Sequence, residues 1–214
     1  MVIKFKFSKY IAMIVSLTGI IVMIGWFFNV QILQSILPQS LPMKFFTAFC
    51  FFLSGIIFYF LVKDNEIKND INKMIILFSG FIIFLIMTSF LISIFLNTKI
   101  GLNNLFVKEN IDFVKTTVQD SPSLFVIINF ILVLCFSLFN FVKTKFVLQI
   151  KKIIALIITL LGILTVIGYL ANIPKFYGQF NNISTATTLN AAILFILLGI
   201  GFFIFSNYNN LSED

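Results

Sequence analysis

The residues that could perform chemistry are few and lie far apart in the sequence. The chain of 214 residues has no histidine and two cysteines, Cys50 and Cys135, each inside an apolar run. Two cysteines without histidine cannot complete the tetrahedral ligand set that zinc prefers. No serine or cysteine has an adjacent base that would activate it as a nucleophile. The sequence therefore predicts no enzyme activity, no metal site and no bound cofactor.

Polar side chains within apolar runs are the remaining candidates for a binding site. Thr47, Asn129 and Asn190 fall in the predicted outer third of the second, fourth and sixth runs. If these runs pack into one bundle, the three side chains would form a shallow polar pocket near Trp26 and Tyr169, suited to an apolar or weakly polar signal. The alternative is that each makes a hydrogen bond between helices, which contributes about 0.6 kcal/mol on average. This structural interpretation is the simpler of the two.

The composition excludes a soluble globular domain, because 60% of the residues are hydrophobic, 11% are charged and the mean hydropathy is +1.09. A soluble domain carries about 25% charged residues. A helix needs about 20 apolar residues to cross about 30 Å of hydrocarbon. Six charge-free runs fit this length: Tyr10–Phe28, Phe45–Val62, Met74–Leu96, Leu124–Val142, Ile153–Leu170 and Thr187–Phe205. We therefore predict an all-α membrane protein with six transmembrane helices in one domain, residues 1–214.

The lysines predict how these helices are oriented. All 15 basic residues are lysine. With the N-terminus in the cytoplasm, ten lysines fall in cytoplasmic segments and five outside, as the positive-inside rule requires. An even number of helices then places the C-terminus inside as well, in a multi-pass protein of the plasma membrane. Because the lysines flank apolar runs, the lipid bilayer is the predicted partner and nucleic acid is not.

An internal repeat predicts how the helices pair. The pattern G-I-x3-I-G-[WY]-x2-N-[VI] covers residues 19–30 and recurs at residues 162–173, an offset of 143 positions. The helices that follow also align, around Gly55 and Gly199, at an offset of 144. The simplest architecture is three antiparallel hairpins, of which the middle one is the weaker copy. Their approximate bounds are 10–62, 74–142 and 153–205.

Each repeated residue type has a structural use. Trp26 and Tyr169 fall at outer helix ends, where amphipathic rings suit the headgroup layer. Asn29 and Asn172 suit the helix exit, because asparagine tolerates the left-handed conformation that ends many helices. Four glycines would let helix backbones approach closely. These predicted packing glycines are Gly25, Gly55, Gly168 and Gly199.

On these motifs the chain resembles the six-helix N-terminal membrane module of bacterial and archaeal sensor histidine kinases and related signalling proteins. That module repeats a glycine–aromatic pair, a short loop with proline and an N-T-A-L-x-F-L-L-x-G-like helix. The matching stretches are Gly25-Trp26 with Pro38 and Pro42, Thr47–Gly55, Gly168-Tyr169 with Pro174, Asn190–Gly199 and the loop segment Ile100–Phe106. Phe46 stands where the first repeat would have asparagine, and the sequence to Asp214 contains no PAS or kinase region.

The resemblance implies a non-catalytic sensor or signalling module that passes a signal across or from within the membrane. Its partner would be a membrane or cytoplasmic protein, or a second copy of the chain. Two alternatives remain open: an accessory or structural subunit of a membrane complex, and a small neutral-solute transporter. Ion transport is disfavoured because the six runs contain no lysine, aspartate or glutamate. The loop Asn97–Ser123 is predicted to lay short amphipathic segments on the outer surface.

Overall fold

The chain folds into a bundle of helices, and the computed structural model describes residues 2–35, 41–66, 69–96, 122–142, 144–178 and 186–211. All regular elements in these ranges are helical, as predicted. The long helices are α1 (Val2–Phe27), α3 (Phe45–Glu66), α4 (Asp70–Leu96), α5 (Leu124–Phe139), α6 (Lys145–Ala171) and α7 (Leu189–Leu211). Single turns follow α1 and α6, namely α2 (Gln31–Gln34) and the 3-10 helix η2 (Pro174–Tyr177). Pro38 lies outside the described ranges. So does most of the loop Asn97–Ser123, for which the amphipathic segments are predicted.

Five of these helices are long and apolar enough to cross a membrane: α1, α3, α4, α6 and α7. The fourth predicted run, Leu124–Val142, forms a shorter helix than its sequence suggests. α5 has 16 residues and ends at Phe139, after which Asn140 and Phe141 form a turn. Its length is about 24 Å, less than the thickness of about 30 Å that a spanning helix covers. The sixth span therefore stays a prediction, although five are suited to the bilayer.

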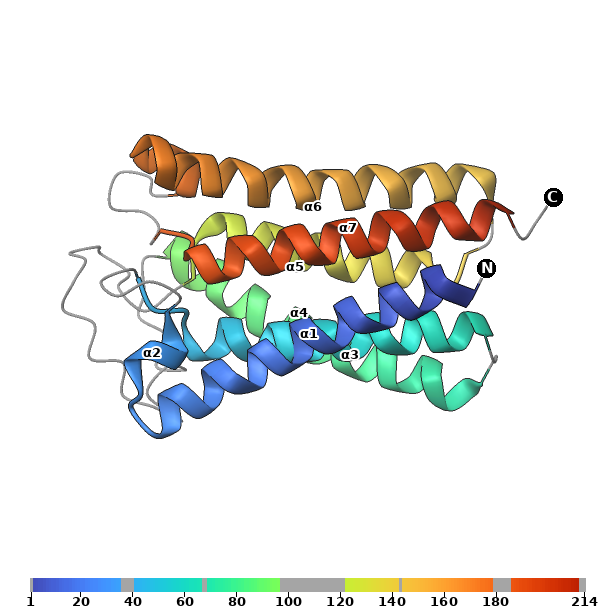
Figure 1. The fold of residues 1–214 in the computed structure, drawn as a ribbon, viewed down its shortest axis with the longest axis horizontal. Coiled ribbons are helices and arrows are strands. Elements are labelled where there is room, and N and C mark those ends of the chain that lie inside the picture. The colour runs from blue at the N-terminus through green and yellow to red at the C-terminus, as the bar shows by residue number, and fades with distance from the viewer. Residues whose placement is uncertain are drawn as a thin grey trace.

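The long helices lie side by side along one axis (Figure 1). α3 buries 72% of its most apolar stretch and α7 buries 61%, whereas α1, α4 and α6 each bury less than half. α1 packs along α3, and α6 packs along α7. Figure 1 also shows both chain termini at one end of the bundle and α2 at the other. We call these the terminal end and the loop end.

Phenylalanine rings of α3, α5 and α7, which we call the inner helices, form the core. Phe51 of α3, Phe130 of α5 and Phe195 of α7 meet with ring centroids 4.6 to 5.1 Å apart. Nearer the terminal end, the rings of Phe136 and Phe202 stack at 4.0 Å. Aromatic pairs in these geometries add stability beyond the area they bury. Three helices that are distant in sequence are therefore held together through aromatic contacts.

Glycines allow close contact within two helix pairs, α1–α3 and α6–α7, which we call the outer pairs because they are the first and last along the chain. A Cβ atom on Gly55 would lie 2.7 Å from the carbonyl oxygen of Ala12, and one on Gly199 would lie 2.8 Å from that of Ala155. Both glycines therefore lie where helix backbones meet, as the small-residue rule predicts. Gly25 and Gly168 differ from the prediction. A Cβ on either would lie 2.7 Å from the Cβ of Leu33 or Phe176, which belong to the short turns α2 and η2 rather than to a neighbouring helix.

Candidate binding layer at the loop end

The loop end begins where α1 and α6 stop in the same way. Asn29 and Asn172 have φ angles of 54° and 53°, in the left-handed region. The next N–H groups donate backward, from Val30 to the carbonyl of Gly25 at 2.8 Å and from Ile173 to that of Gly168 at 2.9 Å. This is the hydrogen-bond pattern of a Schellman cap, which satisfies carbonyls at a helix end. The sequence-based prediction for both asparagines is confirmed.

A side chain near the end of each capped helix, α1 or α6, also donates a hydrogen bond to the backbone just before its partner helix, α3 or α7. The indole Nε1 of Trp26 donates to the carbonyl of Met43 at 2.7 Å, just before α3. The hydroxyl of Tyr169 donates to the carbonyl of Thr187 at 2.8 Å, just before α7. Trp26 is 5% exposed. The polar tip of this indole therefore binds the protein backbone, and its place in the headgroup layer stays a prediction.

Backbone hydrogen bonds complete the two connections. The N–H of Met43 donates to the carbonyl of Gln34 at 2.9 Å, and that of Thr187 donates to the carbonyl of Tyr177 at 2.7 Å. The turns α2 and η2 are thus each tied to the residues that start the next helix. We call these two assemblies, residues 25–43 and 168–187 in their described parts, the first and second clamp. They hold the polar side chains of the loop end in place.

One predicted site residue connects the second outer helix pair to the first clamp. The amide Nδ2 of Asn190 on α7 donates to the carbonyl of Gln34 at 3.2 Å. The side chain of Gln34 in turn donates to the carbonyl of Gly25 at 3.0 Å. Asn190 and Gln34 are 5% and 6% exposed, so both bonds are shielded from the surroundings. This arrangement matches the structural interpretation of Asn190, a polar contact between segments distant in sequence.

Asn129 on α5 has a different environment. It is 1% exposed, and its carbonyl oxygen Oδ1 has no hydrogen-bond partner among the described residues. Leaving a buried acceptor unpaired costs about 1–3 kcal/mol. Thr47 on α3 is also buried and lies one turn before Phe51, whose ring contacts that of Phe130, the neighbour of Asn129. Both side chains therefore lie close to the level at which the three inner helices meet.

Two hydroxyls that the sequence analysis did not select also belong to this end. Ser123 and Thr187 are buried, and their hydroxyl oxygens are hydrogen-bonded to each other. Ser123 also caps α5 by accepting from the N–H of Val126 at 3.3 Å. A serine before an apolar run is a typical N-cap signal. Its pairing with a threonine 64 positions away leaves no trace in the local sequence.

The terminal end contains a buried cation, Lys151, which is one of the ten lysines predicted to lie in cytoplasmic segments. Lys151 lies within α6 and is 2% exposed. Its ammonium donates to Oδ1 of Asn140 at 2.8 Å and lies 5.4 Å from the ring centroids of both Phe136 and Phe205. Cation–π attraction at such distances stabilises a desolvated ammonium. Lys151 therefore connects α5, α6 and α7 rather than facing water.

The loop end thus brings four of the five predicted site residues into shielded positions: Trp26, Thr47, Asn129 and Asn190. Tyr169 is partly exposed and its ring stacks on that of Tyr177 at 4.7 Å. Among the described residues, no group of three or more histidine, cysteine, aspartate or glutamate side chains is placed to hold a metal. Comparison with protein-family models found no matching family, and comparisons with curated proteins and with solved structures found no similar chain.

Proposed function

We propose that this chain is a non-catalytic membrane module that binds a small, weakly polar ligand next to Asn129 and passes the resulting change to a protein partner. The observation that carries the proposal is the buried Oδ1 of Asn129, which has no hydrogen-bond partner among the described residues. A ligand with one hydroxyl or amide donor and an apolar body would pair this oxygen.

The arrangement of the bundle supports a role in signalling. In this proposal the helices form three hairpins of one design, with both termini in the cytoplasm and the bundle in the plasma membrane. The matched clamps support the duplication, and the presence of both termini at one end supports a common side for output (Figure 1). The rings of Phe130 and Phe195 join α5 to α7, so a ligand at Asn129 would act on the helix that leads to the C-terminal side. The partner would bind at the terminal end.

The proposal can be tested with the chain in lipid nanodiscs. The probes are n-hexanol, which has one donor, and n-hexane, which has none. Spin labels at Phe141→Cys and Asn207→Cys, in a background with the native cysteines replaced, measure the distance between the ends of α5 and α7. We expect hexanol, and not hexane, to raise the melting temperature and change this distance.

Two variants of α5 separate the ligand effect from a general effect of alcohol on the bilayer. Asn129→Leu removes the acceptor and is expected to abolish both responses. Ser137→Ala is the matched control, because the Ser137 hydroxyl bonds within its own helix, to Leu134 at 2.8 Å. A full response to hexanol in Asn129→Leu, or an equal response to hexane, would refute the proposed ligand site at Asn129. If the responses are absent and a second polypeptide copurifies in mild detergent, an accessory subunit becomes the better assignment.

A further inference from the structure

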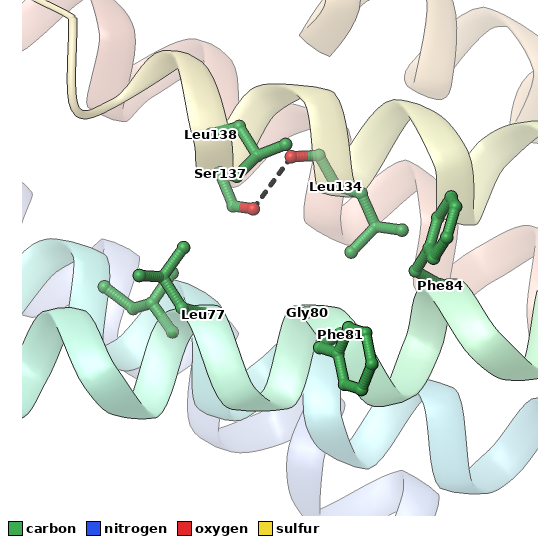
Figure 2. Close-up of a pocket in the computed structure, with 8 residues that line it drawn as sticks. Leu77, Gly80, Phe81, Phe84, Leu134, Ser137 and Leu138 are labelled. Atoms are coloured by element: carbon green, nitrogen blue, oxygen red, sulfur yellow. Dashed lines mark hydrogen bonds between the residues drawn. The ribbon is translucent and has the colours of Figure 1, made fainter.

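A groove separates α4 from α5 on the outside of the bundle. Its volume is about 250 Å³, and Figure 2 shows it between the two helices, with Leu134 of α5 pointing toward α4. Leu138 of α5 also lines it. The α4 side is formed by Ile76, Leu77, Gly80, Phe81 and Phe84. Leu77, Phe81, Phe84 and Leu138 are each about half exposed, so the groove is open to the surroundings. It is distinct from the proposed ligand site at Asn129.

The described lining of the groove offers no free hydrogen-bond donor to an occupant. Among the described residues that line it, Ser137 is the one polar residue, and the Ser137 hydroxyl already donates to the carbonyl of Leu134 (Figure 2). Gly80 deepens the groove because it has no side chain. A Cβ there would lie 3.4 Å from Cδ2 of Leu134, an ordinary contact, so glycine is not required for the helices to pack. A hydrocarbon chain suits this groove, because it has no polar group of its own that would be left without a hydrogen bond.

The depth of the groove fits one leaflet of a bilayer. α4 begins at Asp70 and is apolar enough to cross a membrane. The lining residues from Ile76 to Phe84 extend about 12 Å along the helix axis, at about 1.5 Å per residue. They start about one and a half turns below the first residue of α4. A lipid with its headgroup at the start of α4 would therefore place its acyl chain along the groove.

Charge at the mouth of the groove complements a phospholipid headgroup. Lys73 lies on the same helical stripe as Leu77, one turn closer to the start of α4. Its ammonium is 2.9 Å from the carboxylate of Asp70, and the two side chains are 42% and 93% exposed. The pair has no net charge, and it offers a cation for a phosphate and an anion for an amine. A headgroup that carries both charges matches this pair better than an anionic one.

We propose that the α4–α5 groove binds one acyl chain of a zwitterionic, amine-bearing phospholipid from the surrounding bilayer, with its phosphate at Lys73 and its amine at Asp70. The lipid fills the space that the short helix α5 and Gly80 leave open. This lipid site is independent of the ligand layer at the loop end. It would be occupied in the resting membrane.

The test uses the full chain in nanodiscs that contain a phosphatidylethanolamine with a photoactivatable diazirine on one acyl chain. After irradiation, peptide mass spectrometry locates the crosslinks. We expect them to concentrate on the groove residues of α4 and α5 relative to the outward-facing Phe78, which is 68% exposed on the same helix. Gly80→Leu fills the groove from within and should lower the groove crosslinks about tenfold.

Further variants keep the test decisive if Gly80→Leu fails to fold. Leu138→Trp fills the groove from its exposed side and should act like Gly80→Leu, whereas Phe78→Leu should have no effect. Asp70→Asn removes the partner of the amine, so it should lower the copurified ratio of phosphatidylethanolamine to phosphatidylglycerol. Crosslinks spread evenly over the exposed apolar faces would overturn the site. So would crosslinks that are unchanged when the groove is filled, an unchanged lipid ratio in Asp70→Asn, or protection of the groove by a second copy of the chain.

Discussion

The outer helix pairs, α1–α3 and α6–α7, are packed more closely than the middle pair, α4–α5. In α1–α3 and α6–α7, a Cβ on Gly55 or Gly199 would approach a neighbouring carbonyl oxygen to 2.7 or 2.8 Å. In α4–α5, a Cβ on Gly80 would keep 3.4 Å from Leu134, and a groove lies beside it. The outer pairs are further tied by clamps at the loop end. Helices of similar composition therefore give two closely packed pairs and one looser pair, and the contacts of the glycines distinguish them.

The largest expected effect comes from adding a methyl group at these glycines. Gly55→Ala and Gly199→Ala force a side chain against backbone, and each should lower the free energy of unfolding by about 1–3 kcal/mol. Gly80→Ala meets an ordinary contact, and it removes a flexible residue from a helix interior. It should leave stability unchanged or raise it by up to about 1 kcal/mol. Denaturation in detergent, followed by circular dichroism, measures all three. Equal losses at the three positions would remove the difference between outer and middle pairs.

Breaking the clamps should produce the next largest effect. Trp26→Phe and Tyr169→Phe each leave a backbone carbonyl without its donor, which costs about 1–3 kcal/mol when the carbonyl is buried. Trp26 should have the larger effect, because its ring is almost fully buried. Hydrogen exchange should also quicken at Met43 or at Thr187, in the clamp that was changed. If exchange quickens equally at both, the clamps are coupled rather than separate.

The helix caps test whether the two outer pairs are equivalent. Asn29→Ala and Asn172→Ala place an ordinary residue in the left-handed region, which should lower the free energy of unfolding by about 1–2 kcal/mol. Asn29→Gly and Asn172→Gly should retain most of the stability, because glycine adopts this conformation freely. Matched melting temperatures for the two alanine variants would support equivalence. A loss at one position alone would show that the loops constrain the two caps differently.

The smallest expected change in stability lies in α5. Asn129→Leu removes a buried acceptor that has no partner among the described residues, and it should raise the free energy of unfolding by up to about 1 kcal/mol. Ser137→Ala, on the same helix, should change it by less than about 0.5 kcal/mol. Both are measured by the same denaturation. A clear loss in Asn129→Leu would mean that this asparagine supports the bundle instead of being available to a ligand.

The sequence predicted the parts of the fold that depend on local signals. Long apolar runs identified the helices, because a spanning segment must satisfy its backbone internally. Asn29 and Asn172 were assigned to the left-handed exit, since few other residues occupy it. Gly55 and Gly199 were assigned to close contacts. Each of these inferences needs only a residue type and its neighbours along the chain.

The candidate site was less predictable because it depends on contacts between distant segments. The hydrogen bond between Asn190 and Gln34 joins residues 156 positions apart. The partner of Trp26 is a backbone carbonyl, which carries no sequence signal. The end of α5 at Phe139 was missed because the apolar run continues past it to Val142. In the same way, the burial of Lys151 depends on the two rings and the amide that tertiary folding brings to it.

The contacts of Lys151 set the sliding register of three helices at the terminal end. Phenylalanine and leucine side chains tolerate axial shifts, because one apolar neighbour can replace another at little change in energy. An ammonium held between Phe136, Phe205 and the Asn140 amide depends on the positions of all three groups. A shift of α7 by one turn would carry Phe205 about 5.4 Å from its place. The contacts of Lys151 therefore favour one axial position of α7 at the terminal end, as the hydrogen bonds of the clamps do at the loop end.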